Sequence, residues 1–245
     1  KAIAEKLQST NQKIDDVLER LDQFLDQAPR QRAAVIQAGV TGNLTKNWRA
    51  ESGYSLDDWG DGAVGDFVSI DSRLVDPAEH PNLPHIAPDS IEKASGRLLD
   101  YRSVAEDGVT SGKQHFFPGQ VLYSKIRPYL SKAVHVEFEG LCSADMYPLS
   151  TQGSARFLWY FLLSPGFVDA ASNAGSRTVL PKINQKELRA LPALIPGVVE
   201  QHEIARVLDV AIARLQAAGD AVLEVREILA QVKQIVRRRA VRGLW

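Results

Sequence analysis

Two polar segments in the second half of the chain carry the side chains that nucleic-acid recognition needs. Segment 124–132 (SKIRPYLSK) places serine, lysine, arginine and tyrosine around a proline, and segment 175–184 (GSRTVLPKIN) adds arginine, threonine, lysine and asparagine. Lysine holds phosphate as a point charge, whereas arginine can bind guanine through two parallel hydrogen bonds. We therefore expect Arg127 and Arg177 to discriminate between bases and the lysines to hold phosphates.

A third candidate is the sequence Lys113, Gln114 and His115, which we expect to form a polar loop before the first segment. Gly175 and Ser176 are small enough to allow close backbone approach. A plainer alternative is that 124–132 is only strand and turn. The full set of candidate DNA contacts is Lys113, Gln114, Ser124, Lys125, Arg127, Tyr129, Lys132, Arg177, Thr178, Lys182 and Asn184.

Charge is distributed unevenly along the 245 residues. The total is −1, but 50–112 carries −9 and 113–190 carries +4. Because attraction to phosphate depends on local charge, 113–190 can still face a nucleic acid, and we expect the acidic stretch to face elsewhere. The alternative is that the asymmetry reflects only solvated surface.

Several kinds of chemistry lack their residues in this sequence. Cys142 is the single cysteine, and the five histidines are scattered, so neither a disulfide nor a metal site is expected. There is no glycine-rich nucleotide motif, no HExxH and no nuclease centre. We therefore predict a cytoplasmic protein without cofactors, without catalysis of its own and without a membrane role, since no apolar run is long enough for a span.

The two ends of the chain repeat each other at an offset of 201 residues. Six positions carry this repeat: Ile3, Ala4, Leu7, Val35, Val40 and Gly42 recur as Ile204, Ala205, Leu208, Val236, Val241 and Gly243. Both copies also have apolar residues spaced by seven. The longer rows are Leu208, Leu215, Val222, Leu229 and Val236, with Ile204, Ala211, Ala218, Val225 and Val232 beside them.

Such heptad rows predict two long helices that pair as an antiparallel coiled coil, although any amphipathic helix pair has apolar stripes. Pro29 predicts a kink or break near Ala28, and Gly42 should end the first helix. Glu200 and Gln201 are expected near the start of the second helix, where a carboxylate is favourable. The arginine-rich run 237–242 could touch DNA or complement the helix end, but we favour a protein partner.

Between the helices the sequence indicates a mixed α/β domain. Short β-rich runs such as 63–70, 115–123 and 132–140 are separated by Gly, Pro, Asp and Asn. The apolar stretch 156–172 is interrupted by Pro165, which predicts a buried helix followed by another. The expected fold class is α+β, with the boundaries 1–43, 44–199 and 200–245.

An ordered series of motifs resembles the specificity subunits of type I restriction-modification systems. It consists of QRAAVIQAGVTGNLTKNWR, FFPGQVLYSKIRPYLSKA, GLCSADMYPL and GSRTVLPKINQKELRALPALIPGVVEQHEIARVLD. The resemblance implies a target-recognition domain that reads half of a bipartite double-stranded DNA target. It also implies docking of a methyltransferase subunit, which uses S-adenosylmethionine, and of an ATP-dependent restriction subunit that translocates and cleaves DNA.

One feature departs from the family pattern. The family alternates two recognition domains with two conserved helices, whereas this chain has one domain between two helices. Either a first domain is missing, or the chain is a half-sized subunit that forms a homodimer. Two further alternatives are a coiled-coil scaffold that binds protein and no DNA, and a stand-alone nuclease or methyltransferase with an unrecognised active site.

Overall fold

The computed structural model describes residues 2–175 and 180–241. It divides into two compact units, one formed by the chain up to Arg32 together with the chain from Asp209 onward, and the other by Ala33–Leu208. The first unit is helical and the second contains all the strands among the described residues. The fold is thus mixed helix and sheet, as the sequence predicts.

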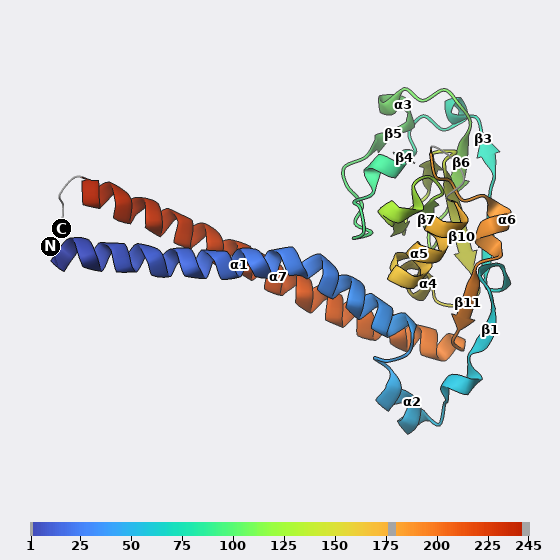
Figure 1. Cartoon of the computed structure of the whole chain (residues 1–245). Helices are drawn as coiled ribbons and strands as arrows, with labels where there is room; N and C mark the ends of the chain where they lie inside the picture. The colour runs from blue at the N-terminus through green and yellow to red at the C-terminus, as the bar shows by residue number, and fades with distance from the viewer. Residues whose placement is uncertain (1, 176–179, 242–245) are drawn as a thin grey trace. The chain divides into compact units, whose positions relative to one another are not determined.

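The helical unit is an antiparallel pair. It consists of most of α1 (Ala2–Val40) and most of α7 (Val198–Val241), which lie side by side in Figure 1. Arg226 Nε donates to Asp22 Oδ1 over 2.5 Å, and Lys233 bonds Asp15. Moving one heptad forward in α7 moves the partner one heptad back in α1, so the two helices run in opposite directions with heptad register.

The two apolar rows of α7 have different surroundings. Leu215, Val222 and Leu229 are half-buried, as expected for side chains that face α1. The second row is exposed from Ala218 onward, and Val225 and Val232 keep 46% and 40% of their surface. A pair of helices therefore buries one row and leaves most of the other open.

The prediction at Pro29 was a kink or a break, and a break is ruled out because α1 continues without interruption from Ala2 to Val40. A proline inside a helix costs roughly 3 kcal/mol, which packing on both sides can offset. The predicted end of this helix is confirmed. Gly42 has φ +75°, a left-handed conformation that suits glycine, and its N–H donates to Gly39 O over 2.9 Å.

The described residues of the mixed domain form three sheets. One pairs β1 with β11; a second has the order β2-β10-β7-β8; a third has the order β3-β6-β9-β4-β5. All neighbouring strands are antiparallel except β4 and β9. The strands are β1 (Gly60–Ala63), β2 (Val68–Ile70), β3 (Leu74–Val75), β4 (Pro84–Ile86), β5 (Arg102–Ser103), β6 (Lys113–Phe116), β7 (Val121–Ser124), β8 (Ala133–His135), β9 (Gly140–Cys142), β10 (Met146–Thr151) and β11 (Pro192–Ile195).

Short helices connect the strands, and α4 packs against β7, β8 and β10. The apolar stretch 156–172 forms two of these helices, as predicted, and Ser164 separates them by ending α4 and capping α5. The helices are α2 (Lys46–Ser52), α3 (Val104–Asp107), α4 (Ala155–Leu163), α5 (Pro165–Ala174) and α6 (Gln185–Arg189), with single 3-10 turns η1 (Leu56–Asp58), η2 (Val64–Asp66), η3 (Pro77–Glu79), η4 (Pro88–Ser90) and η5 (Pro128–Leu130).

A buried cluster joins the two larger sheets. Ile86, Phe116 and Cys142 from the five-stranded sheet pack with Leu122 and Met146 from the four-stranded sheet, and all five are fully buried. This core fixes the strand ends from which the candidate loops leave. No helix in the described part of the chain has a stretch apolar and long enough to cross a bilayer.

Candidate nucleic-acid interface

The structure brings the two main candidate segments together. Arg127 N donates to Pro181 O over 2.8 Å, and Ile183 N donates to Lys125 O over 3.0 Å. Ile126 and Lys182 form an antiparallel bridge between these hydrogen bonds. Segments that are about fifty residues apart in the sequence therefore form one continuous surface.

A carboxylate that the sequence analysis did not single out lies between the lysines of this surface. Asp145 Oδ1 is 3.2 Å from Lys182 Nζ and 3.7 Å from Lys125 Nζ. Lys125 Nζ also donates to Ala144 O over 2.6 Å and lies 5.3 Å from the centre of the Tyr147 ring. Burial, followed by the charge of Lys182, lowers the pKa of Lys125. Lys125 is thus engaged in holding the surface together.

The turn after β7 projects different side chains. Arg127 and Ser131 both have left-handed backbones, with φ +48° and +49°, on either side of η5. Arg127 is exposed, and Tyr129 at the centre of the turn keeps 50% of its surface. Ser131 is buried and its hydroxyl has no hydrogen-bond partner. Lys132 Nζ donates to Pro88 O over 2.6 Å, which ties this end of the turn to the η4 region.

The predicted polar loop at 113–115 is wrong, because these residues form β6 inside the five-stranded sheet. Their polar composition suggested a loop, but β3 and β9 satisfy their backbone groups on both sides. Lys113 is 6% exposed, and its Nζ donates to Ser111 O and Oγ, both over 2.7 Å. Burial lowers the pKa of Lys113.

The other two side chains of this stretch are also inward-facing. Gln114 is buried, and its Oε1 has no partner. His115 Nε2 lies 2.8 Å from Glu139 Oε1. DNA contacts by these residues remain a prediction that would require their side chains to move.

The remaining candidates of the second segment differ in their surroundings. Asn184 caps α6, because its Oδ1 accepts from Glu187 N over 2.9 Å while Glu187 Oε2 accepts from Asn184 N over 3.0 Å. The close backbone approach expected at Gly175 is to the chain itself, since Lys182 N donates to Gly175 O over 3.3 Å. Ser176, Arg177 and Thr178 lie outside the described residues.

A buried ion pair near the beginning of α7 was also not predicted from the sequence. Glu200 bonds Arg49, accepts from Thr45 Oγ1 over 2.8 Å and accepts from Trp59 Nε1 over 2.8 Å. Arg49 Nη2 also donates to Gly42 O over 2.8 Å. The signal in the sequence was a basic and an acidic residue within the motifs LTKNWR and VVEQHE, but their pairing spans 151 residues.

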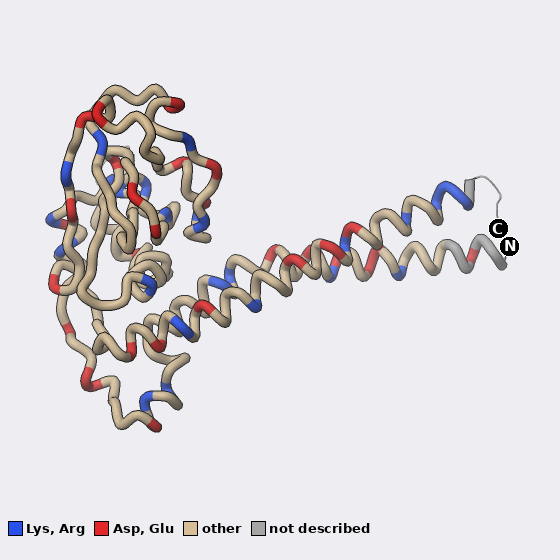
Figure 2. The backbone as a smooth tube through the Cα atoms, turned by 180° about the vertical axis from the view of Figure 1, so that it is seen from behind, with Lys and Arg blue, Asp and Glu red and all other residues tan. Residues whose placement is uncertain are grey.

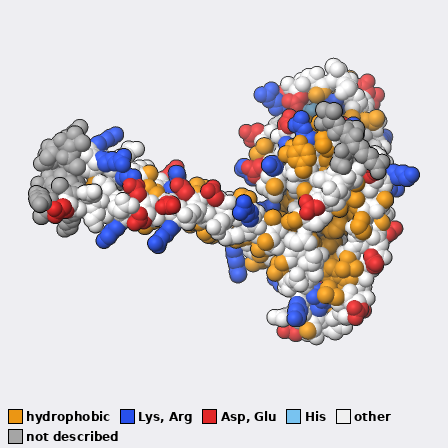
Figure 3. Space-filling model, in the orientation of Figure 1, with side chains coloured by type: hydrophobic (Ala, Val, Ile, Leu, Met, Phe, Trp, Pro, Cys, Tyr) orange, Lys and Arg blue, Asp and Glu red, His pale blue; other side chains and the backbone are white. Residues whose placement is uncertain are grey.

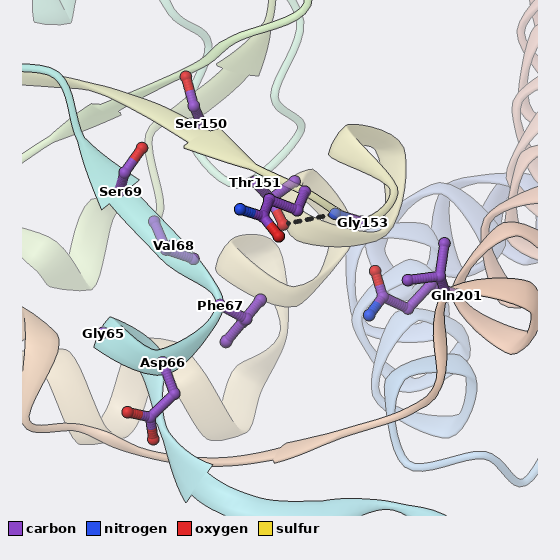
Figure 4. A pocket seen from close by; sticks show the side chains of 11 residues that line it. Gly65, Asp66, Phe67, Val68, Ser69, Ser150, Thr151, Gly153 and Gln201 are labelled. Carbon is purple, nitrogen blue, oxygen red and sulfur yellow. Dashed lines mark hydrogen bonds between the residues drawn. The ribbon is translucent and has the colours of Figure 1, made fainter.

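Next to this ion pair, Gln201 connects α7 to the mixed domain. Its Oε1 accepts from Ser154 N over 2.9 Å, and its Nε2 donates to Pro196 O over 2.8 Å. Gln201 also borders a pocket of about 470 Å³, around which Figure 4 shows Phe67 and Thr151. None of the described DNA-contact candidates lines this pocket, so it is separate from the candidate interface.

Comparison with solved structures shows which proteins share this fold. The helical pair with a mixed α/β domain is similar in fold to two structures of restriction-modification proteins. A crystal structure of the HsdS subunit from Thermoanaerobacter tengcongensis matches 99% of the chain and 57% of that protein, with 16% identity and a TM-score of 0.58. A structure described as showing complex assembly and conformational transition of the type I R-M system matches 97% of the chain and 59% of that protein, with 19% identity and a TM-score of 0.61.

Sequence comparison adds one relative with a named role. The chain is 38% identical, over 98% of its length, to the type I restriction enzyme EcoDI specificity subunit of Escherichia coli, and it covers 59% of that relative. No family model matches the chain. The chain is therefore similar over nearly its whole length to the type I restriction specificity subunits, and it spans about three fifths of the relatives it matches.

Proposed function

We propose that this chain is a non-catalytic DNA-specificity module that reads one half of a bipartite double-stranded target. The observation that carries the proposal is that two separate polar segments, 124–132 and 180–184, form one surface in a chain that is 38% identical to a specificity subunit. Arg127 and Tyr129 are exposed on that surface. Arginine supplies directional donors for base edges, and the backbone around it is held by hydrogen bonds.

The helical unit is the proposed docking surface for the methyltransferase and restriction subunits. S-adenosylmethionine and ATP would bind to those partners and not to this chain. Support comes from the apolar side chains that α7 leaves exposed. They include Leu223, Val225, Ile228, Val232 and Ile235. Figure 3 shows apolar side chains among charged ones along the helical unit.

The arginine run at the C-terminal end of α7 is part of the proposed docking surface. Figure 2 shows basic residues near the far end of α7, where Arg237, Arg238 and Arg239 follow one another. In keeping with the prediction from sequence, we assign this run to a protein partner. The proposal also includes a division into 1–43, 44–199 and 200–245 and a cytoplasmic location. If the subunit is naturally half-sized, it includes a homodimer.

Selection from a randomised duplex library tests the proposal. The full chain would be purified with its methyltransferase subunit, and bound duplexes would be sequenced at two salt concentrations. We expect enrichment of one short motif, or of two copies at fixed spacing if the chain forms a homodimer. Stable complex formation without any enrichment would overturn the DNA-reading role and favour a protein scaffold.

A further inference from the structure

A short hairpin from the acidic half of the domain reaches the candidate interface. Ile91 and Leu98 form an antiparallel bridge, and Glu92 N donates to Arg97 O over 2.9 Å. The Glu92 carboxylate closes the turn by accepting from Ser95 Oγ over 2.5 Å and from Arg97 Nη2 over 2.7 Å. The tip of this hairpin, Lys93 and Ala94, is exposed.

The hairpin is anchored on both sides. Ile91 is fully buried in the domain core. Gly96 has φ +69° and lies against Trp159, where a Cβ atom would come within 2.7 Å of the indole. The tip is bonded to the η5 turn, because Ala94 N donates to the carbonyls of Leu130 and Ser131, both over 3.2 Å. The hairpin and the η5 turn therefore form one connected ridge.

Backbone strain is concentrated at this junction. Among the described residues, those other than glycine with positive φ are Ala94 at +59°, Arg127 at +48° and Ser131 at +49°. A left-handed backbone costs about 1–2 kcal/mol for a residue with a Cβ atom. Such strain persists only where the surrounding structure enforces it, and it is concentrated at ligand-binding sites. The junction thus maintains a fixed backbone shape at an energetic cost.

Ion pairing separates the cations of this ridge into two groups. Lys125 and Lys182 lie beside Asp145, Lys132 lies 3.7 Å from Asp89, and Arg97 is paired with Glu92. Lys93 and Arg127 have no carboxylate partner among the described residues. Their charges are therefore the ones available to an anionic ligand.

We propose that the 91–98 hairpin is a second DNA-contacting element, in which Lys93 holds a backbone phosphate beside the bases that the Arg127 turn reads. The inference rests on the proposed function of the domain. It departs from the expectation that the acidic stretch 50–112 faces away from DNA, because in this hairpin Glu92 is paired with Arg97 and Lys93 is exposed. Phosphate attraction depends on the local arrangement of charge.

The test compares two exposed lysines in the full chain bound to its methyltransferase subunit. Lys93→Ala removes the proposed phosphate contact. Lys46→Ala removes an equal charge from α2, which lies away from β4, β5 and α5 in Figure 1. Binding of the selected duplex would be measured by fluorescence anisotropy at several salt concentrations, with thermal unfolding as a check on folding.

For Lys93→Ala we expect five- to ten-fold weaker binding, an unchanged selected motif, and a slope of log affinity against log salt that is smaller by about 0.9. Lys46→Ala should behave as the wild type. If the wild type selects a motif but Lys93→Ala keeps the wild-type salt slope, the hairpin is not a contact and the proposed function stands. If the wild type selects no motif, the proposed function itself fails.

Discussion

The indole Nε1 of Trp59 donates a 2.8 Å hydrogen bond to Oε2 of Glu200, 141 residues further along the chain. The other carboxylate oxygen bonds Arg49 and Thr45, and all four side chains are buried. A buried charge is tolerated only when it is paired and its lone pairs are satisfied, which this arrangement achieves. The network joins the turn after α1 to the first turn of α7.

Replacing Glu200 with alanine should destabilise the chain. The change leaves Arg49 as a buried, unpaired cation, and removing one partner of such a pair costs about 3–5 kcal/mol. Glu203→Ala is the matched control, because its partner Arg206 is largely exposed and an exposed pair contributes at most about 1 kcal/mol. Urea unfolding would measure both variants. An equal loss of unfolding free energy in both variants would show that the buried network stabilises the chain no more than the Glu203–Arg206 pair does.

Asp145→Asn should strengthen binding to duplexes of arbitrary sequence. The substitution removes the carboxylate that lies 3.2 Å from Lys182 Nζ, so the charge of this half-exposed lysine becomes available to phosphate. We expect a three- to ten-fold gain in affinity at low salt and a steeper salt dependence. Anisotropy with a duplex that lacks the selected motif would measure this, and Asp57→Asn in η1 would control for net charge. A gain of equal size in both variants would contradict a local effect.

Ser131→Gly should stabilise the domain. Ser131 has φ +49° and its hydroxyl has no partner, so glycine relieves a strained backbone without removing a hydrogen bond. We expect a gain of roughly 0.5–1 kcal/mol, because part of the relief is offset by the greater freedom of glycine in the unfolded chain. Ser164→Gly provides the contrast, since Ser164 has φ −70° and caps α5. Thermal unfolding midpoints that move in the same direction for both variants would argue against strain at Ser131.

Local patterns in the sequence were sufficient to predict the two long helices and the helices α4 and α5. Heptad spacing predicted both long helices, and Pro165 correctly divided the apolar stretch into α4 and α5. These signals depend on residues within a few turns of each other. At Pro29 the local pattern allowed a kink or a break, and the helix continues through the proline without a break.

The site depended on contacts between distant residues, which no local pattern contains. Asp145 is one acidic residue among many until β10 positions it beside Lys182. Lys93 was grouped with an acidic stretch, although Ala94 is bonded to the carbonyls of the η5 turn. Strand pairing gives β6 two neighbours, and this pairing explains why Lys113 is buried in a strand and not displayed on a loop.

Aspartate should destabilise the chain at one position of α7 and have little effect at the next. Val222 is half-buried in the row that faces α1, whereas Leu223 keeps 49% of its surface. Val222→Asp places a charge against apolar neighbours and should lower the thermal unfolding midpoint and the helical circular dichroism signal. Leu223→Asp should change the stability of the isolated chain little. Equal loss in both variants would contradict the register of the helical pair.

Cys142 should be unreactive in the folded chain and should make its stability sensitive to alkaline pH. Burial raises the pKa of its thiol to about 12, whereas an unfolded cysteine ionises near 8.5. Alkylation by iodoacetamide at pH 8 should therefore be slow in buffer and fast in urea.

The sign of the linkage follows from the same values. Below about pH 8.5 the thiol is neutral in both states. As the pH rises towards 12, the unfolded thiol ionises first, so unfolding becomes more favourable by about 1.4 kcal/mol per pH unit. Cys142→Ala should lose this share of the pH dependence between pH 9 and 10, measured by urea unfolding at about those two values. An identical pH dependence in wild type and variant would show that the thiol is not shielded in the core.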